Sequence, residues 1–179
     1  WDEDEPKNAE CGREMLERGD WIVPTFNYGL RTDKPILLYW LMLTAYRECG
    51  VSEFSARLAS ALMSTGTCFL TFLIGRRLYG GEAGLWSGLI LCCTLMFCVV
   101  SRAATPDATF IFCSTLAFWL FLEGIARRQS GLAAKGNRLP VPEDGFATYL
   151  QSLIPTTPLL WLSWGAIGLA ILAKGPAGW

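Results

Sequence analysis

Long apolar stretches with few charges dominate the chain beyond residue 57. Four uncharged stretches approach the roughly 20 residues that a helix needs to cross a bilayer; they cover residues 58–75, 83–101, 108–122 and 158–173. The third is short, and the residues that follow Glu123 would complete it. The pattern predicts an all-α fold, a polytopic transmembrane helical bundle with about four spans.

A fifth apolar run, ILLYWLMLTAY at 36–46, is too short to cross the membrane. It favours an interfacial or re-entrant helix, because Tyr39, Trp40 and Tyr46 are aromatic residues of the kind that lie at headgroup level. We therefore expect this run to belong to a juxtamembrane segment on one face of the membrane.

The basic residues indicate the orientation of the bundle. Arg76 and Arg77 follow the first span, and Arg127 and Arg128 follow the third, so both ends face the same side. The positive-inside rule makes that side cytoplasmic in the inner (plasma) membrane and places the opposite ends at the periplasm or exterior. The predicted organisation is a first outer loop with juxtamembrane helices at 1–55, three spans within 56–128 with an outer turn at 101–107, a cytoplasmic loop at 129–157, and a fourth span within 158–179.

Composition narrows the class further. The 179 residues carry 15 basic and 16 acidic side chains, a net charge of −1, so no nucleic-acid partner is predicted. The chain has no histidine and no CxxC motif, which together exclude a zinc site of the usual ligand spacing. Of its seven cysteines, only Cys11 and Cys49 lie in polar surroundings, and whether they pair is open. Without an initiator Met, the chain is expected to be an internal piece of a longer protein.

Charged residues outside the spans gather on the predicted outer face. Each group has a purely structural explanation: the acids of DEDEP and ATPDATF suit helix N-termini, and the lysine of LAKGPAG suits a side chain that snorkels from a helix end. These explanations do not account for the convergence of three outer segments, which favours a shared site. The candidate residues are Asp4, Glu5, Lys7, Asp33, Lys34, Arg102, Asp107 and Lys174.

The order of the motifs resembles a known enzyme family. WDEDEPKNAECGREMLERGDW is followed by TDKPILLYW, GVSEFSARLASAL, GRRLYG and KGP, as in the integral-membrane glycosyltransferases that use polyprenyl-phosphate sugars. These include the dolichyl-phosphate-mannose protein mannosyltransferases and the lipid A aminoarabinose transferases, to which the resemblance is greatest. The resemblance implies a many-helix bundle of the GT-C type whose first outer loop forms the active site, and transfer of a sugar from a lipid-linked donor.

The resemblance also implies roles for the candidate residues. Asp4 and Glu5 correspond to the family's Asp-Glu pair, whose aspartate is the usual catalytic candidate. Asp33 and Lys34 correspond to an acid-Lys-Pro motif, in which the lysine approaches the carrier phosphate. The catalytic set would be Asp4, Glu5 and Asp107, and the substrate-binding set would be Lys7, Asp33, Lys34, Arg102 and Lys174.

Two positions depart from the family motifs. Lys7 and Asn8 stand where the family has an arginine and an aromatic residue, and Asp33 stands where it has a glutamate. Lys7 and Asp33 keep the charges of the family residues, but their side chains differ in length. A lysine also cannot form the two parallel hydrogen bonds that an arginine makes to a phosphate. The donor sugar is therefore not restricted to aminoarabinose.

The residue types suit sugar transfer. Cleavage of a sugar phosphate develops negative charge on the phosphate, which Lys7 and Lys34 would stabilise, while Asp4 would act as general base toward an acceptor hydroxyl. Asp33 and Asp107 would orient the acceptor or hold a divalent cation, for which carboxylates without histidine favour Mg²⁺ or Mn²⁺. The expected partners are a polyprenyl-phosphate-linked sugar, a lipid, glycan or protein acceptor, and membrane lipids.

Two other classes share the membrane pattern. A transporter or channel would carry ionisable residues inside its spans near the midplane, whereas the charges here lie at the ends of the spans. A non-catalytic membrane subunit would explain the spans but not the ordered motifs. The glycosyltransferase is therefore the preferred interpretation.

Overall fold

The computed structural model describes residues 4–31, 34–134 and 158–175 and confirms the all-α fold class. Within these ranges the regular structure is helical except for one two-stranded hairpin. The elements are α1 (Asp4–Arg18), β1 (Thr25–Phe26), β2 (Gly29–Leu30), α2 (Ile36–Cys49), α3 (Glu53–Tyr79), α4 (Gly81–Cys93), α5 (Leu95–Arg102), α6 (Pro106–Ala134) and α8 (Pro158–Lys174).

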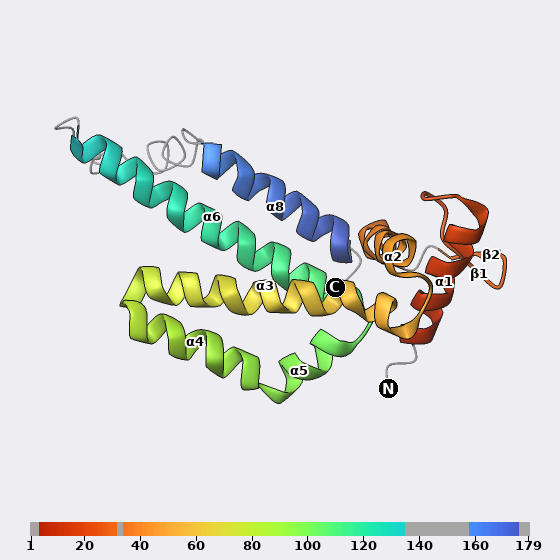
Figure 1. Ribbon diagram of the computed structural model, residues 1–179. Coiled ribbons are helices and arrows are strands. Elements are labelled where there is room, and N and C mark those ends of the chain that lie inside the picture. The colour runs from red at the N-terminus through yellow and green to blue at the C-terminus, as the bar shows by residue number, and fades with distance from the viewer. Residues whose placement is uncertain (1–3, 32–33, 135–157, 176–179) are drawn as a thin grey trace.

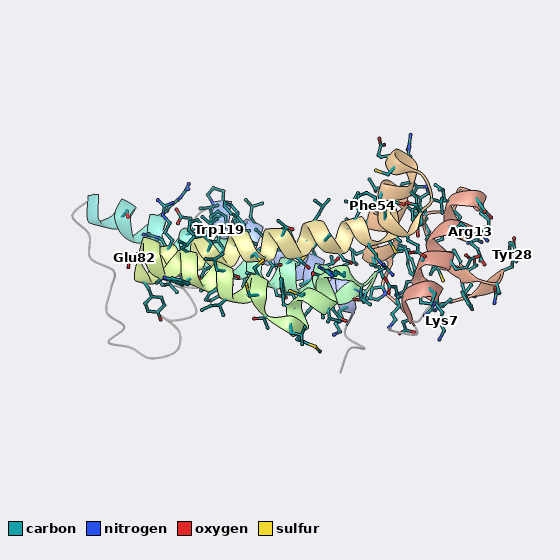
Figure 2. All side chains as sticks on the ribbon, turned by 60° about the horizontal axis from the view of Figure 1, so that its bottom comes forward. Lys7, Arg13, Tyr28, Phe54, Glu82 and Trp119 are labelled. Carbon is teal, nitrogen blue, oxygen red and sulfur yellow. The ribbon has the colours of Figure 1, made fainter. Side chains whose placement is uncertain are left out.

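The long helices run side by side as two antiparallel pairs (Figure 1). α3 packs against α4, and α6 packs against α8, while contacts between α3 and α6 join the pairs into one bundle. α1, α2 and the hairpin lie at the end of the bundle where α3 and α6 begin and α8 ends. Figure 2 shows Lys7, Arg13 and Tyr28 at this end of the elongated molecule and Glu82 toward the other. The predicted first outer loop is thus a small helical layer at one end of the spans.

Among the described residues, two helices are long and apolar enough to cross a membrane, and a bent pair supplies a third candidate. α3 contains the predicted span at 58–75, and α6 contains the one at 108–122. The predicted span at 83–101 is instead divided into α4 and α5, which meet at an angle of 65°. α8 has 17 residues, somewhat short of the roughly 20 that a full span needs.

The break between α4 and α5 lies at Thr94. Its backbone is extended (φ −69°, ψ 119°), and its N–H donates to the carbonyl of Leu91 at 3.1 Å. The Thr94 hydroxyl donates to the Ile90 carbonyl at 2.8 Å, a contact that competes with the helical ladder and often bends helices. The Cys98 N–H then donates to the Thr94 carbonyl at 3.0 Å, so α5 starts at once in a new direction.

α2 begins after Pro35, whose ring fixes φ at −67°, and confirms the short helix predicted at 36–46. One face of α2 packs on α1 and forms the core of the small helical layer. Two of the three aromatic residues expected at headgroup level lie in this core instead, because α1 covers them. Tyr39 and Tyr46 are 0% and 3% exposed, whereas Trp40 is 38% exposed.

α3 and α4 approach closely because glycines line their contact. A Cβ added at Gly84 would lie 2.6 Å from the backbone nitrogen of Arg76 and 2.8 Å from the carbonyl oxygen of Phe72. One added at Gly75 would lie 2.9 Å from the Cα of Gly84. Side chains do not come this near to backbone atoms, so both positions require glycine. Small residues of this kind let membrane helices pack where no hydrophobic effect drives them together.

Basic residues mark the end of the bundle away from α1. Arg77 of α3 and Arg127 of α6 lie 3.6 Å and 3.0 Å from the two carboxylate oxygens of Glu123. The Arg77–Glu123 pair joins the ends of α3 and α6 that the sequence places on one side of the membrane, while Arg127 holds Glu123 within α6. α6 continues to Ala134, past the loop start predicted at 129, and most of the predicted cytoplasmic loop lies outside the described residues.

Candidate functional site

Asp4, the first residue of α1, is surrounded by three cations. Lys34 Nζ lies 2.7 Å from Asp4 Oδ2, while Arg31 Nη2 and Lys7 Nζ lie 3.6 Å and 3.9 Å from Oδ1. We call these four residues the Asp4 cluster. The Asp4 side chain is 35% exposed, so the carboxylate remains accessible from solvent. Three of the four members, Asp4, Lys7 and Lys34, are residues that the sequence motifs predict for the site.

The cations change the acidity of Asp4. The hydrogen bond from Lys34 is the main cause that lowers the pKa of Asp4 below its ordinary value. The positive charges of Lys34, Lys7 and Arg31 act in the same direction, against partial desolvation of the carboxyl group. Asp4 is therefore ionised at neutral pH, which is the state that a general base requires.

Arg31 completes the cluster and is not among the residues predicted from the sequence. Its side chain is only 9% exposed, and its guanidinium lies 5.7 Å from the centre of the Phe26 ring. Its Nη1 donates to Cys11 Sγ at 3.7 Å, and its backbone N–H donates to the Pro24 carbonyl at 3.0 Å. A charged residue beside a strand usually faces solvent, so the sequence does not indicate that Arg31 is buried. The one signal for its place in the site is that it lies three positions before Lys34 of the acid-Lys-Pro motif.

The hairpin that precedes Arg31 is fixed to α1 by Glu14, which sequence reasoning also missed. This carboxylate is 2% exposed and accepts hydrogen bonds from Thr25 Oγ1 at 2.6 Å and from the Tyr28 N–H at 3.2 Å. The Thr25 hydrogen bond is the main cause that lowers the pKa of Glu14, against desolvation. Asn27 and Tyr28 have positive φ values of 52° and 61°, as a tight two-residue hairpin turn requires.

Besides a cavity of about 360 Å³ whose lining includes Glu5, Arg57 and Ala104, two further cavities lie near the predicted site residues. One of about 330 Å³ opens beside the Asp4 cluster and is lined by Asp4, Lys7, Phe26, Gly29, Leu30 and Arg31. The other, of about 820 Å³, is largely apolar and lies between α6 and α8, with Phe110, Phe118 and Trp164 among its lining. The first combines cations with an aromatic ring, and the second offers an apolar surface along two membrane helices.

Asp107 and Lys174 form a second charged pair. Lys174 Nζ, at the end of α8, lies 2.7 Å from Asp107 Oδ1 in the first turn of α6. The same ammonium lies 5.8 Å from the centre of the ring of Phe110, which also lines the apolar cavity. The pair joins the ends of α6 and α8, and within the described part of the chain it makes no ion pair with the Asp4 cluster.

The remaining predicted residues fall in different places. Glu5 contacts α3 and the segment before α6: its Oε1 lies 2.7 Å from Arg57 Nε and accepts a hydrogen bond from the Ala104 N–H at 3.2 Å. Arg102 ends α5 with an exposed side chain and makes no ion pair with another described residue. Asp33 lies outside the described residues.

The sequence also suggested a bound divalent cation and left open whether Cys11 and Cys49 pair. In the described part of the chain, no three His, Cys, Asp or Glu side chains form a group that could hold a metal ion. The Mg²⁺ or Mn²⁺ ion therefore stays a prediction. Cys11 is buried and Cys49 is exposed, and both are free thiols.

Comparison with known proteins relates this site to a family. The sequence profile of the dolichyl-phosphate-mannose-protein mannosyltransferase family matches residues 33–136. An uncharacterized protein of Aquifex aeolicus is 31% identical over 179 residues, which cover 99% of this chain and 30% of that protein. The undecaprenyl phosphate-alpha-4-amino-4-deoxy-L-arabinose arabinosyl transferase 2 of Pseudomonas fluorescens (strain Pf0-1) is 30% identical over 186 residues, which cover 98% of this chain and 33% of that protein.

A solved structure shows the same fold. ArnT from Cupriavidus metallidurans, in its crystal structure bound to undecaprenyl phosphate, matches with a TM-score of 0.74 and 27% identity over 99% of this chain and 29% of that one. The chain thus spans about a third of the length of these relatives. The family profile covers more than half of the chain. The chain therefore belongs to the dolichyl-phosphate-mannose-protein mannosyltransferase family.

Proposed function

We propose that the full-length protein is a membrane glycosyltransferase that moves a sugar from a polyprenyl-phosphate carrier to a lipid, glycan or protein acceptor at the outer face of the membrane. The observation that carries the proposal is the Asp4 cluster, one carboxylate among three cations beside a cavity of about 330 Å³. The family profile, and the similarity to ArnT bound to undecaprenyl phosphate, support the class of donor.

The cations of the cluster would bind the carrier phosphate. As the bond between the anomeric carbon and the phosphate oxygen breaks, its electron pair passes to the oxygen, where preorganised cations stabilise the developing charge. Arg31 is suited to this role because Phe26 and Cys11 hold its guanidinium in place. It offers the planar fork that Lys7 lacks.

Asp4 would act as general base toward the acceptor. It would take the proton of the acceptor hydroxyl while the hydroxyl oxygen forms a bond to the anomeric carbon. Attack from the face opposite the leaving phosphate would transfer the sugar with inversion. Asp107, held by Lys174 at 2.7 Å, would orient the acceptor or the sugar, and Arg102 and Asp33 would complete the substrate contacts.

The proposal is tested by transfer with the full-length protein in proteoliposomes. Polyprenyl-phosphate aminoarabinose and polyprenyl-phosphate mannose, each radiolabelled in the sugar, are supplied separately together with membrane lipids as acceptor. We expect one donor to be consumed, with release of polyprenyl phosphate and label in the acceptor fraction. Movement of the intact donor across the membrane without cleavage would instead identify a transporter.

The proposed orientation places α1 and the Asp4 cluster on the periplasmic or exterior side of the inner membrane. In a variant without native cysteines, Ile22→Cys should react with a membrane-impermeant maleimide added outside, because Ile22 is 76% exposed. Ser130→Cys, beyond the basic residues of α6, should react only after the membrane is permeabilised. The opposite pattern would reverse the orientation and remove the reactive face from the outside.

A further inference from the structure

Two side chains of α1 hold the backbone of a single residue in the segment before α6. Glu5 Oε1 accepts a hydrogen bond from the Ala104 N–H at 3.2 Å, and Asn8 Nδ2 donates one to the Ala104 carbonyl at 3.1 Å. The partners are 99 and 96 positions apart in the sequence. Ala104 is 1% exposed, so these backbone groups need partners within the protein. We call Glu5, Asn8 and Ala104 the α1 clamp.

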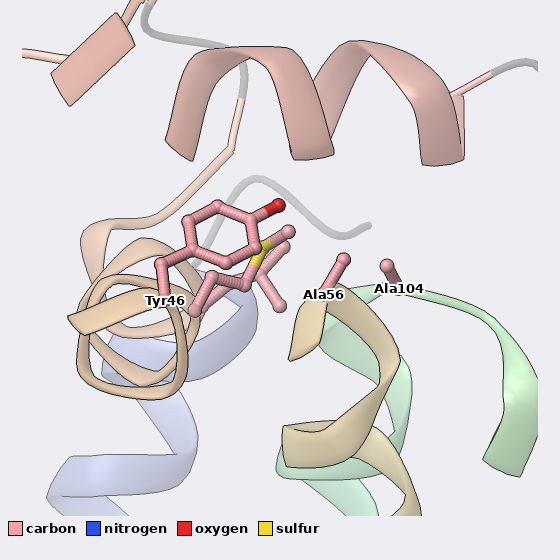
Figure 3. Packing of buried hydrophobic residues seen from close by; sticks show 5 residues of the cluster. Tyr46, Ala56 and Ala104 are labelled. Atoms are coloured by element: carbon pink, nitrogen blue, oxygen red, sulfur yellow. The ribbon is translucent and has the colours of Figure 1, made fainter. Parts of the chain in front are cut away.

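The clamp rests on a packed core. Arg57 of α3 binds the same oxygen of Glu5, with its Nε at 2.7 Å, and the Glu5 side chain is only 13% exposed. Ala56, next to Arg57, belongs to a buried cluster with Tyr46 and Ala104 that lies beneath α1 (Figure 3). The clamp thus joins α1 to α2, α3 and the start of α6 at one place.

The clamp also connects two parts of the proposed site. Glu5 follows Asp4 directly in α1, and Ala104 lies three residues before Asp107. The short link contains Pro106, whose ring fixes φ at the start of α6 and leaves the link little freedom. A shift of α1 against this segment would therefore change the separation of the Asp4 and Asp107 carboxylates.

The clamp satisfies the backbone of Ala104 but carries a cost in stability at Asn8. Asn8 is 0% exposed, and its Oδ1 has no hydrogen-bond partner among the described residues. An unpaired buried oxygen costs free energy that an apolar side chain would avoid. Glu5 is an acidic side chain that is only 13% exposed and needs Arg57 of α3 as its partner there. Side chains that break packing rules in this way are typical of functional positions.

We propose that Glu5 and Asn8 are positioning residues that fix Asp107 relative to the Asp4 cluster. This inference rests on the proposed function. In this role Glu5 touches neither donor nor acceptor and acts through the backbone of Ala104. The role differs from the catalytic one that the Asp-Glu motif implies.

Glu5→Gln separates the two roles in the full-length enzyme. Both contacts of Glu5 fall on one carboxylate oxygen, so the amide oxygen of glutamine can accept both. A positioning residue should keep kcat within about three-fold after this change, since net hydrogen-bond contributions are small. A loss as large as that of Asp4→Asn would make the carboxylate catalytic and overturn the proposal.

Glu5→Ala and Asn8→Ala release the clamp itself. We expect kcat to fall about 10- to 100-fold, because a small misplacement of a reacting group costs this much, while the donor KM changes little. Tyr46→Phe is the matched control, since it removes a 3.2 Å hydrogen bond from α2 to the Ala9 carbonyl of α1 but keeps the ring that packs in the cluster with Ala104 and leaves both hydrogen bonds of the clamp in place. Unchanged kcat in both alanine variants, or a rise in KM that matches the fall in kcat, would contradict the proposal.

A distance measurement separates this inference from the proposed function, because it requires no activity. Spin labels are placed at Glu17 of α1 and Ser114 of α6, both exposed, in the full-length chain without native cysteines. Asn8→Ala should shift or broaden the distance distribution, and Tyr46→Phe should leave it unchanged. A shift in a protein that transfers no sugar would refute the proposed function but keep the clamp, whereas an unchanged distribution would refute the clamp.

Discussion

The Asp4→Asn variant of the full-length enzyme is expected to lose sugar transfer while it still inserts and folds. The substitution keeps the shape of the side chain, and asparagine serves a helix N-terminus about as well as aspartate, but the proton acceptor is gone. General-base catalysis contributes about 10²- to 10⁴-fold, so turnover should fall by a factor in that range. Initial rates of transfer at equal amounts of inserted protein check this.

Two controls show that the loss comes from the base. Glu17→Gln removes another carboxylate of α1, but Glu17 is exposed and its ion pair among the described residues is with Arg13 of the same helix, at 3.2 Å, so transfer should be unchanged. Because Lys34 and the other cations hold the pKa of Asp4 below its ordinary value, the wild-type base is already ionised at neutral pH. Raising the pH should not restore the variant, because the asparagine amide has no carboxyl group that could ionise. Near-normal turnover of Asp4→Asn would leave Asp4 with a structural role at the start of α1.

Lys34→Ala is expected to weaken use of the lipid-linked donor by about 2 kcal/mol or more, or about 30-fold, because charge-assisted contacts to a partly desolvated phosphate are strong. The Lys34 side chain is only 27% exposed and is directed to the Asp4 carboxylate, not to bulk solvent. Lys34→Arg should preserve function in part, since the guanidinium is longer and planar. Donor KM and binding of polyprenyl phosphate are measured for both variants beside the wild type.

Arg47→Ala provides the matched control for loss of a cation. Arg47 is an exposed residue near the end of α2 and belongs to no part of the proposed site. Its replacement should leave donor use unchanged. If Lys34→Ala and Lys34→Arg also used the donor as well as the wild type, Lys34 would be an interface residue only, and the phosphate contact would have to be sought at Arg31, Lys7 or Lys174.

The apolar runs predicted where the helices lie, but not that one of them breaks. In a bilayer, an uncharged run as long as 58–75 or 108–122 is helical because its backbone N–H and C=O groups must hydrogen-bond within the segment. The two runs lie within α3 and α6, as predicted. Residues 83–101 are equally apolar and contain no proline. Their bend depends on the side-chain hydrogen bond of Thr94 and on the helices around it, which periodicity does not report.

At the site, the motifs placed Asp4 and Lys34 on one face of the membrane, and the structure brings the two side chains to 2.7 Å. The motifs missed two buried charges. Arg31 and Glu14 lie in polar stretches, where charged side chains usually face water. Their burial arises only when the hairpin folds onto α1 and brings Thr25 to the Glu14 carboxylate. The role expected of Glu5 came from its place in a motif, whereas its partners, Arg57 of α3 and Ala104 before α6, are distant in the sequence and meet Glu5 only in the folded chain.

The bend at Thr94 shortens the reach of one membrane span. With α4 upright, α4 rises about 20 Å, and α5, turned by 65°, adds only about 5 Å. A straight helix of the same length would rise about 32 Å, close to the roughly 30 Å of hydrocarbon in a bilayer. A span shorter than the hydrocarbon layer is matched by local thinning of the bilayer, by snorkelling of flanking side chains or by association with other helices. In the proposed orientation, such thinning beside α5 would bring the headgroup of a lipid-linked donor closer to the end of the bundle where α1 and the Asp4 cluster lie.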